Sequence, residues 1–444
     1  MIFKTFRIGG VNLDGNKLTD KVATVQADLP SQAVFPLSQH FGTPAKPVVK
    51  KNDHVKVGSL IAEADGMLSA NIHSSVSGIV HEVHTVVDSS GCRKPAIIIN
   101  VEGDEWEEYI DRTSKLELLE HHPELTAEEI IIRIKDAGVT AMDETGMPTY
   151  STLTSPDSAK TECIILNGAE CEPYATADYR LMMEHADEIL VGLDLLMKAT
   201  DVEHGYVGIE VDKPSAIALL RKKTANRNDV EIVSLKQKYP QGGYKQLVEA
   251  VTGRQVSASV AMPVSGEAKV YNVATAFAVY EAVMKHKPLF ERYTTVTGKE
   301  MAHPGNFLVR MGTPVGQLID ACGGMPVSDN KVIMGTPMTG CAIKELSSPI
   351  VKDSNCITIL SGREAYQHKP SPCLRCAKCV DACPMGLEPY LLATLSDLKM
   401  WNKAERECIT SCMECGSCQF VCPAYRRLLD SIRIGKQMVA EIIK

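Results

Sequence analysis

Residues 373–384 read CLRCAKCVDACP, and residues 412–423 read CMECGSCQFVCP. Each stretch spaces four cysteines as C-x2-C-x2-C-x3-C and follows the last with a proline, so five positions recur at an offset of 39. The two runs supply eight of the nine cysteines found between Cys373 and Cys422, out of fifteen in the 444-residue chain. Dense cysteines in a long chain whose start lacks a secretion signal favour metal ligation over a disulfide scaffold.

This spacing is typical of bacterial proteins with two 4Fe-4S clusters, in which three close cysteines hold one cube and the fourth ligates the other. By that rule the first cluster is held by Cys373, Cys376, Cys379 and Cys422, and the second by Cys412, Cys415, Cys418 and Cys383. Paired C-x2-C elements also form zinc sites with four cysteine ligands. Two zinc ions would leave the third spacing of each run and both prolines unexplained.

The segment between the two runs is predicted to contain an amphipathic helix that packs over the clusters or forms the core of this region. Its apolar positions at helical spacing are Leu391, Leu392, Leu395, Leu398 and Trp401. Cys408, the ninth cysteine of the block, is predicted to be a buried thiol and not a ligand. Two adjacent cubes pass electrons singly, so another site must supply or accept those electrons.

Composition narrows the possible function classes. With 44% hydrophobic and 23% charged residues, the chain has the make-up of an ordinary globular protein. A net charge of −8 argues against broad nucleic-acid binding, which needs a basic face to displace counterions from phosphates. No apolar run approaches the roughly 18 to 20 residues that span a bilayer. We therefore expect several domains in a chain that neither crosses a membrane nor is exported.

The pattern along the chain predicts four regions in a multidomain α/β and α+β protein. Residues 1–105 are β-structure that resembles the barrel-sandwich fold of biotinyl and lipoyl carriers, although the hairpin at 62–78 has no lysine to be modified. Residues 125–285 alternate strands and helices, which predicts a largely parallel sheet. Residues 290–360 form a small α+β unit. A polar, proline-containing linker then leads to the cysteine-rich residues 366–444.

Two loops of the α/β region are candidates for ligand binding, because ligands bind where loops leave the carboxyl ends of parallel strands. Strands are expected at residues 163–166, 206–209 and 230–235, with a helix at 181–199. The loop after the first strand, Asn167 to Tyr174, is dense in polar groups. The loop after the third ends in Tyr239-Pro240-Gln241-Gly242-Gly243, whose backbone N–H groups can approach an anion or a flat ring. Tight turns are the alternative explanation for these glycines.

The order of these parts resembles the RnfC family, soluble subunits of membrane-bound Rnf electron-transport complexes. The resemblance covers almost the whole chain, and it rests on the order of the motifs because no motif outside the cysteines is decisive. The motifs are Phe6-Arg7-Ile8-Gly9-Gly10, Asn167 to Tyr174 with Thr176-Ala177-Asp178, Tyr239 to Gly243, Val296-Thr297-Gly298, Pro337-Met338, and Pro372 to Leu387.

The resemblance implies a fold and cofactors for the middle of the chain. Residues 125–285 would form a Rossmann-like domain of the FMN- and NADH-binding type, similar to the flavoprotein subunit of respiratory complex I. Residues 290–360 would form a β-grasp domain of the SLBB type. The flavin would convert hydride from NADH into single electrons for the two clusters. The implied cofactor-binding residues are Asn167, Glu170, Glu172 and Tyr174, then Gly242 and Gly243, and Gly146.

One loop departs from the family pattern. Where relatives carry AGIVGLGGAGFPT, residues 137–149 read AGVTAMDETGMPT. Three glycines are replaced by Ala141, Asp143 and Glu144, whose side chains would occupy space that backbone and ligand share. The two carboxylates would repel a phosphate if they point inward and would only alter affinity if they turn to solvent.

Three functional hypotheses follow. In the first, the chain exchanges electrons between NADH, through FMN, and two 4Fe-4S clusters, toward or from ferredoxin, within an assembly coupled to ion movement. In the second, it keeps the clusters but acts as a non-catalytic electron-wiring or assembly subunit. A cobalamin reductase of the PduS type is a third possibility. The expected partners are the other Rnf membrane subunits and a ferredoxin-like protein, with peripheral attachment on the cytoplasmic side of the bacterial cell membrane.

Overall fold

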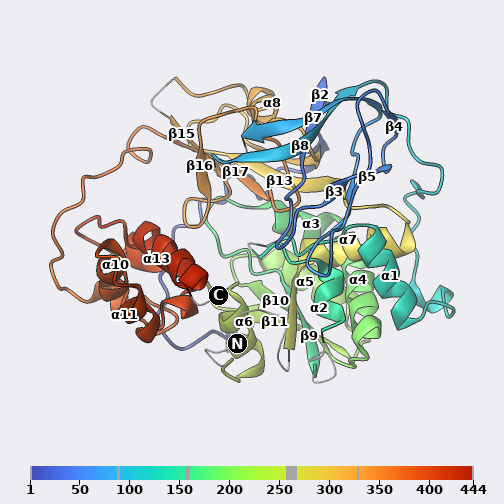
Figure 1. The fold of residues 1–444 in the computed structure, drawn as a ribbon. Helices are drawn as coiled ribbons and strands as arrows, with labels where there is room; N and C mark the ends of the chain where they lie inside the picture. Colours follow the sequence, from blue (N-terminus) through green and yellow to red (C-terminus); the bar gives the residue numbers. More distant parts are fainter. Residues whose placement is uncertain are drawn as a thin grey trace.

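The computed structural model describes residues 3–87, 91–143, 145–155, 161–256, 268–327 and 330–442. Figure 1 shows two β-rich parts at the top, a helix-covered sheet below them, and a helical C-terminal domain at the left. A long connecting stretch leads from the β-rich part to that domain. The mixed, multidomain α/β and α+β class predicted from the sequence is confirmed.

The N-terminal β-module consists of two antiparallel sheets that share one core. Its strand orders are β2-β8-β7-β4 and β3-β5-β6. Phe35, Val80 and Ile97 are fully buried in this core, because successive side chains of a strand alternate between the two faces of a sheet. The strands are β2 (Gln32–Pro36), β3 (Lys46–Pro47), β4 (His54–Val55), β5 (Leu60–Glu63), β6 (Ile72–His73), β7 (Gly78–Val87) and β8 (Arg93–Val101).

The middle of the chain forms a four-stranded, wholly parallel sheet in the order β11-β10-β9-β12. Helices α4, α5 and α7 contribute to the core on one face, and α6 covers the other. Burial on both faces explains the continuous apolar run at residues 163–166. The elements are α1 (Ala127–Asp136), α2 (Thr149–Leu153), β9 (Cys163–Asn167), β10 (Gly205–Glu210), α5 (Pro214–Lys223), β11 (Val230–Leu235), α6 (Tyr244–Thr252), β12 (Ala268–Asn272) and α7 (Val273–Met284).

The single helix expected at residues 181–199 is wrong. The structure has α3 (Ala177–Glu184) and α4 (Ala186–Thr200), separated at His185, whose φ of −133° and ψ of 41° are not helical. The His185 ring lies 3.2 Å from the Glu188 carboxylate through Nδ1 and 2.9 Å from the Tyr293 hydroxyl through Nε2. These two contacts of His185 stabilise the break between the helices. Helix α3 packs against β13 (Glu291–Thr297), and α4 packs against α7.

A six-stranded mixed sheet follows, in the order β1-β14-β13-β17-β15-β16. Its edge strand β1 (Thr24–Gln26) comes from the start of the chain and pairs in parallel with β14. The remaining elements are β13 (Glu291–Thr297), β14 (Gly305–Arg310), α8 (Val315–Ala321), β15 (Asn330–Met334), β16 (Cys341–Ile343) and β17 (Cys356–Ser361).

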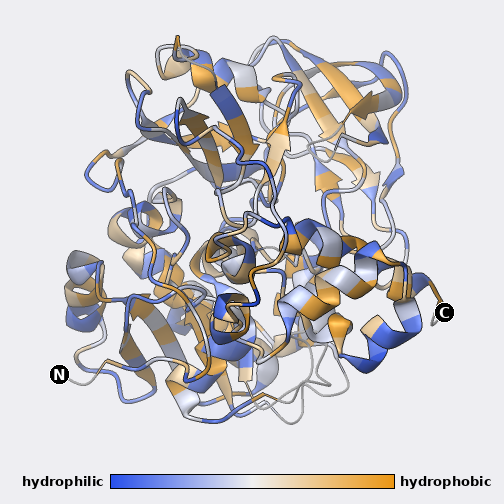
Figure 2. Ribbon diagram, turned by 90° about the vertical axis from the view of Figure 1, so that its left-hand side faces the viewer, coloured by the Kyte–Doolittle hydropathy of each residue, from blue (hydrophilic) through white to orange (hydrophobic). Residues whose placement is uncertain are grey.

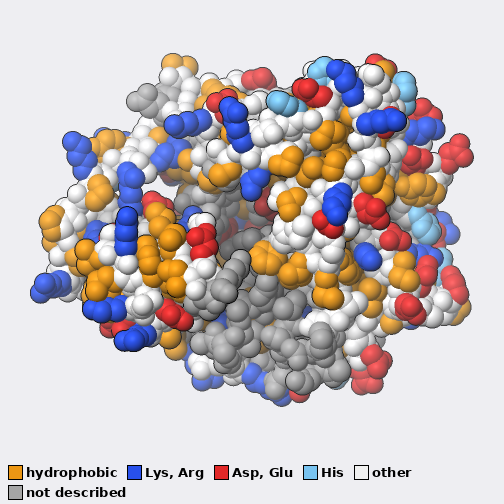
Figure 3. Space-filling model, viewed as in Figure 1, with side chains coloured by type: hydrophobic (Ala, Val, Ile, Leu, Met, Phe, Trp, Pro, Cys, Tyr) orange, Lys and Arg blue, Asp and Glu red, His pale blue; other side chains and the backbone are white. Residues whose placement is uncertain are grey.

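The C-terminal domain is helical, and Lys and Arg side chains line its outer edge at the left of Figure 3. The apolar stripe expected in one helix is divided between two, because α10 ends at Asp397 and α11 begins at Trp401. Leu398 lies between them and is 64% exposed, so its predicted place in the core is wrong. Cys408 is also exposed, contrary to prediction. The helices are α9 (Lys378–Asp381), α10 (Pro389–Asp397), α11 (Trp401–Arg406), α12 (Ser417–Phe420) and α13 (Leu428–Ile442).

Residues 4–26, which we call the N-terminal strap, lie outside the β-module and run across the rest of the molecule. Lys4 pairs beside β11, Val11 pairs with Tyr239, and β1 ends the strap in the six-stranded sheet. In Figure 1 this segment passes between the C-terminal domain and the parallel sheet. The strap therefore contacts three parts of the fold.

Apolar residues concentrate in the strands of the sandwich and of the parallel sheet, which are largely orange in Figure 2. Across the described ranges, no helix combines the length and the apolar character needed to cross a bilayer.

Candidate functional site

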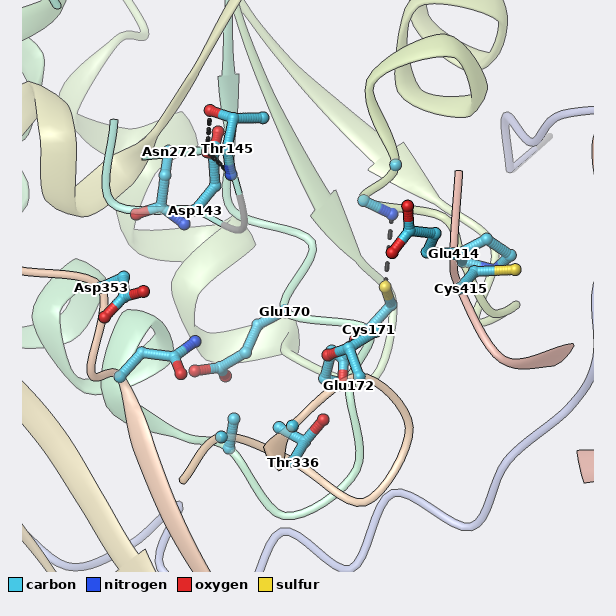
Figure 4. Close-up of a pocket in the computed structure, with 18 of the residues that line it drawn as sticks. Asp143, Thr145, Glu170, Cys171, Glu172, Asn272, Thr336, Asp353, Glu414 and Cys415 are labelled. Atoms are coloured by element: carbon cyan, nitrogen blue, oxygen red, sulfur yellow. Dashed lines mark hydrogen bonds between the residues drawn. The ribbon is translucent and has the colours of Figure 1, made fainter. Parts of the chain in front are cut away.

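A pocket of about 560 Å³ lies where the carboxyl ends of the parallel strands, the six-stranded sheet and the C-terminal domain meet. Its walls come from the loops after β9 and β11, from Met142, Asp143 and Thr145, from the turn after β15, and from the second cysteine run. Figure 4 shows side chains converging on it from several of these walls. Cofactor and ligand sites usually occupy roughly 300 to 1,000 Å³, so the pocket suits a cofactor-sized ligand.

Glu170 and Glu172, in the loop after β9, each contribute one hydrogen-bonded and one open carboxylate oxygen. Oε1 of Glu170 accepts a hydrogen bond of 2.8 Å from the backbone N–H of Asp178 in the first turn of α3. Oε1 of Glu172 accepts a hydrogen bond of 3.1 Å from the hydroxyl of Thr339 and lies 3.1 Å from the hydroxyl oxygen of Tyr239. Among the described residues, Oε2 of both glutamates is buried without a hydrogen-bond partner. Each can therefore accept a hydrogen bond from a bound ligand.

Burial controls the protonation of these carboxylates. It raises the pKa of Glu172 to about 7, although the hydroxyls of Thr339 and Tyr239 favour the charged form. Burial also raises the pKa of Glu170 and lowers that of Lys17, whose Nζ lies 3.9 Å from Glu170 Oε2. Near neutral pH the pocket wall therefore holds carboxyl groups that gain or lose a proton readily.

Two lysines fix the shape of this loop through its backbone. Nζ of Lys17, in the strap, donates hydrogen bonds to the carbonyl oxygens of Glu170, Glu172 and Ala175 at 2.8, 2.8 and 2.7 Å. Nζ of Lys213 donates to the carbonyl oxygen of Ala169 at 2.8 Å. The sequence reasoning missed both lysines. Each lies in a separate segment, with no local motif to indicate that its partners are carbonyl groups of a distant loop.

The two predicted glycines lie on the opposite side of the pocket from the α3 contact. The carbonyl oxygen of Gly242 accepts a 2.9 Å hydrogen bond from Asn167 Nδ2, which joins the two predicted loops. Gly242 N–H donates to Sγ of Cys171 at 3.3 Å. Gly243 meets Met413 of the second cysteine run so closely that a Cβ there would lie 2.4 Å from Met413 Cε.

Tyr239 links the pocket directly to the second cysteine run. Its hydroxyl contacts Glu172 Oε1 and donates a 2.7 Å hydrogen bond to the carbonyl oxygen of Cys415. Met413 and Cys415 themselves line the pocket. A ligand in the pocket and a cluster held by this run would thus be immediate neighbours.

The structure brings five of the seven predicted cofactor-binding residues to this pocket, namely Asn167, Glu170, Glu172, Gly242 and Gly243. It places the other two elsewhere. Tyr174 points away, with its hydroxyl 3.0 Å from the Glu364 carboxylate. Gly146 lines a neighbouring cavity of about 290 Å³ together with His40 and Phe41. The cofactor-binding roles of all seven stay predictions.

In the loop that departs from the family pattern, the carboxylate of Asp143 is hydrogen-bonded within the loop itself. Oδ1 of Asp143 accepts hydrogen bonds from the backbone N–H and the hydroxyl of Thr145, while Asp143 still lines the pocket (Figure 4). Ala141 is buried. Glu144 lies outside the described residues. Asp143 therefore adds negative charge to the pocket wall without aiming both oxygens at a ligand.

The cysteines of each predicted set lie near one another in the structure, and their roles as cluster ligands stay predictions. Cys373, Cys376, Cys379 and Cys422 surround a cavity of about 580 Å³. The thiol of Cys418 is close enough to Cys412, Cys415 and Cys383 to interact electrostatically with all three. Within the described ranges, no three His, Cys, Asp or Glu side chains are arranged to hold a single metal ion. Thiols spread around a cavity suit a cube, in which each ligand binds a separate iron atom.

Family models match four consecutive parts of the chain. The RnfC barrel sandwich hybrid domain matches residues 4–104, and the Nuo51 FMN-binding domain matches residues 134–281. The SLBB domain matches residues 293–342, and the 4Fe-4S dicluster domain matches residues 365–423. FMN and two 4Fe-4S clusters are thus the cofactors of these domains.

Several relatives are similar along most of their length. One is a subunit of the proton-translocating ferredoxin:NAD(+) oxidoreductase complex of Clostridium ljungdahlii, which is 40% identical over 91% of this chain and 87% of its own. The corresponding subunit of the Na(+)-translocating complex of Acetobacterium woodii is 38% identical over 92% of this chain and 91% of its own. A subunit of the ion-translocating oxidoreductase complex of Rhodobacter capsulatus is 38% identical over 86% and 73%.

Among solved structures, a NAD+-reducing [NiFe]-hydrogenase in the H2-reduced state aligns with a TM-score of 0.49 and 16% identity over 70% of this chain and 64% of that chain.

The residues present fit the cofactors that these domains hold. The open oxygens of Glu170 and Glu172 and the unpaired Oγ1 of Thr336, within the described residues, suit the polar edge of a flavin ring. The set of four thiols that includes Cys415 lies beside that pocket, and the set that includes Cys373 lies beyond it. With the domain order and the near-complete coverage of its relatives, the chain belongs to the RnfC family.

Proposed function

We propose that this chain is the subunit of a membrane-associated, ion-translocating electron transport complex that passes electrons between NADH and two 4Fe-4S clusters by way of FMN. The observation that carries the proposal is the shared wall between the pocket and the second cysteine run, to which Met413 and Cys415 contribute. Bound FMN would accept a hydride from NADH and a proton from solvent, then release two electrons one at a time and two protons.

The chain's own residues would bind and orient the cofactor. Oε2 of Glu170 and of Glu172 can accept hydrogen bonds from N–H or O–H groups of the flavin or the nicotinamide nucleotide. Gly242 and Gly243 line the pocket, and because they have no side chains, Asn167 and Met413 can approach the backbone there closely. Burial of Cys383, Cys415 and Cys418 limits the access of water to the second cluster, which affects its reduction potential.

The first cysteine group supplies the exit for electrons in this proposal. Cys373 and Cys376 are exposed, and so are the neighbouring apolar side chains of Leu374 (66%) and Tyr425 (49%). Residues 366–394 and 420–427 contain five Lys and Arg against two Asp and Glu. An apolar centre within a basic surround favours an acidic, ferredoxin-like partner.

The proposed partners are the other membrane subunits of such a complex and this acidic electron carrier. Relatives named as subunits of ion-translocating complexes support that assembly. The chain would lie peripherally on the cytoplasmic side of the bacterial cell membrane, attached through its partner subunits.

Anaerobic preparation of the full chain, followed by titration with NADH, tests the proposal. We expect bound FMN, about eight iron atoms per chain, bleaching of the flavin absorption by NADH, and the electron paramagnetic resonance signals of reduced clusters. A preparation with filled clusters in which neither flavin nor clusters respond to NADH would reject the proposal.

A non-catalytic wiring subunit is the second candidate, favoured by the Asp143 carboxylate at the pocket wall. The substitution Asp143→Asn removes this charge and keeps an acceptor for Thr145. If the chain binds nucleotides, it should strengthen NADH binding by about 1 kcal/mol, or about fivefold in Kd. Calorimetry measures the change. No heat of NADH binding in either protein, with FMN bound, would favour the wiring role.

A further inference from the structure

The N-terminal strap joins parts of the molecule that the electron path must hold together. Val11 and Tyr239 exchange two backbone hydrogen bonds of 2.8 Å, which tie the strap to the loop after β11. Four residues on, the carbonyl oxygen of Gly15 accepts a 2.7 Å hydrogen bond from the backbone N–H of Tyr174, and Lys17 holds the rest of that loop. The strap thus contacts both loops that form the flavin side of the pocket.

The same strap reaches the second cysteine group through Gly9 and Gly10. Gly10 N–H donates a 3.0 Å hydrogen bond to the carbonyl oxygen of Ala382, the residue before the ligand Cys383. At Gly9, an added Cβ would lie 2.3 Å from the carbonyl oxygen of Cys383 and 2.8 Å from the nitrogen of Pro384. Because these are backbone atoms next to a ligand, a side chain could fit only if the strap or the cysteine loop moved.

Backbone conformation adds a second requirement for glycine. Gly9 has a φ of +63° and Gly10 a φ of +86°, and L-residues with a Cβ rarely adopt such values. At Gly10 a Cβ would meet Tyr239 O at 2.9 Å and the far ends of the Lys238 and Phe6 side chains. The motif Phe6 to Gly10 is therefore explained by contact with the cluster domain, with Gly9 as its tightest point.

We propose that the N-terminal strap is a positioning element that sets the separation between the flavin pocket and the second cluster, with Gly9 and Gly10 as its contact on the cluster side. Three connections meet at this point. The N–H of Gly10 donates to the carbonyl oxygen of Ala382, and Val11 pairs with Tyr239 through two backbone hydrogen bonds. The hydroxyl of Tyr239 donates to the carbonyl oxygen of Cys415. The pocket wall and two segments that carry ligands of one cluster are thereby fixed to the same short piece of chain.

The inference rests on the proposed function, because a fixed separation matters only if electrons cross from flavin to cluster. Electron transfer slows as the distance between donor and acceptor grows. Loosening the strap should slow the transfer of electrons from the pocket to the second cluster. It should leave the hydride step in the pocket unchanged, since Gly9 and Gly10 do not line it.

Gly9→Ala in the full chain, with Gly15→Ala as the matched control, tests the proposal. Gly15 belongs to the same strap, but a Cβ there would only touch the Lys17 side chain at 3.4 Å. In stopped-flow mixing with NADH, Gly9→Ala should reduce clusters severalfold more slowly while its flavin bleaches at the normal rate. Gly15→Ala should match the unaltered chain in both phases. Equal slowing of flavin and cluster reduction, or no slowing, would overturn the proposal.

Hydrogen exchange on the chain without FMN or NADH gives a readout independent of activity. The amides of Gly10, Val11 and Tyr239 should exchange faster in Gly9→Ala and at the normal rate in Gly15→Ala. Unchanged exchange in Gly9→Ala would contradict the proposal, whatever the kinetics. If Gly9→Ala does not fold, Gly10→Ala is the second variant. Its closest clash is with the end of the Lys238 side chain at 2.6 Å, and none is as close as the backbone clash at Gly9, so it should give the same split between flavin and cluster at smaller amplitude.

The two proposals can fail separately. If NADH does not bleach the flavin of the unaltered chain, the proposed function fails. Photochemically reduced FMN then replaces NADH as the electron source for the same comparison of variants, and the exchange experiment judges the contacts of the strap.

Discussion

The two cysteine groups have the same spacing in sequence and opposite surroundings in the fold. In the first group, Cys373 and Cys376 are exposed, whereas in the second group Cys383, Cys415 and Cys418 are buried. The difference comes from outside the motif. The second run is covered by the loop after β11 and forms part of the pocket wall, and the N-terminal strap covers the backbone beside Cys383. Two groups with the same cysteine spacing therefore differ in their surroundings. We call the exposed first group the outer group and the buried second group the inner group.

Removing one ligand from each group should have the largest and most unequal effect. Cys415→Ser and Cys373→Ser should each lower iron and acid-labile sulfide by roughly half, since each disables one of two cubes. Only Cys415→Ser should abolish cluster reduction by NADH, because its cluster adjoins the pocket. Stopped-flow absorbance and electron paramagnetic resonance measure both. Equal loss of NADH-dependent reduction in the two variants would contradict the inner and outer assignment.

Charge reversal beside the outer group should affect only the exchange with a partner. Lys369 and Arg427 are exposed near that group and lie outside the ligand runs. We expect the double substitution Lys369→Glu and Arg427→Glu to slow electron transfer to an acidic ferredoxin about tenfold at low salt.

Lys403→Glu, on α11, is the control for this experiment. The defect of the double variant should shrink as salt rises, because ions screen exposed charges. A rate that is insensitive to both salt and charge reversal would place the docking surface elsewhere.

A smaller effect is expected in the pocket beside the inner group, where NADH binding should depend on pH through the protonation of Glu172. Its raised pKa of about 7 means that the carboxyl is neutral below that pH and charged above it. NADH keeps its negative charge over this range, so its binding should weaken by roughly 1 kcal/mol as pH rises from about 6 to about 8. Glu172→Gln should flatten the dependence. Calorimetry across this range is the measurement, and Asp320→Asn, on α8, is the control.

Much of the fold could be predicted because its signals are local. Strands β9, β10 and β11 are short apolar runs bounded by polar loops, and α5 begins at a proline and ends in basic residues. The break at His185 could not be predicted, because its contact with Tyr293 comes from a strand more than a hundred residues away. Leu398 fits the helical spacing and yet lies at a turn between two short helices.

The site divides in the same way. The pairing of Cys383 and Cys422 with the opposite runs could be predicted from spacing, because each predicted ligand set is confined to a short segment and its repeat, and the ligand roles stay predictions. Lys17 carries no such signal, since a lysine bound to carbonyl oxygens looks like any surface lysine in sequence. The contact of the Tyr239 hydroxyl with Cys415 could not be predicted either, although Tyr239 belongs to one of the motifs of the sequence.

The contact between Gly10 and Ala382 also imposes an order on biosynthesis. The strap is synthesised long before Ala382. More than three hundred intervening residues must be translated before Gly10 can form its hydrogen bond with Ala382. The parallel sheet can form during that interval, as earlier domains generally do. The wall between flavin and iron is therefore completed only after translation has passed residue 382, which makes its closure one of the last steps in maturation of the polypeptide.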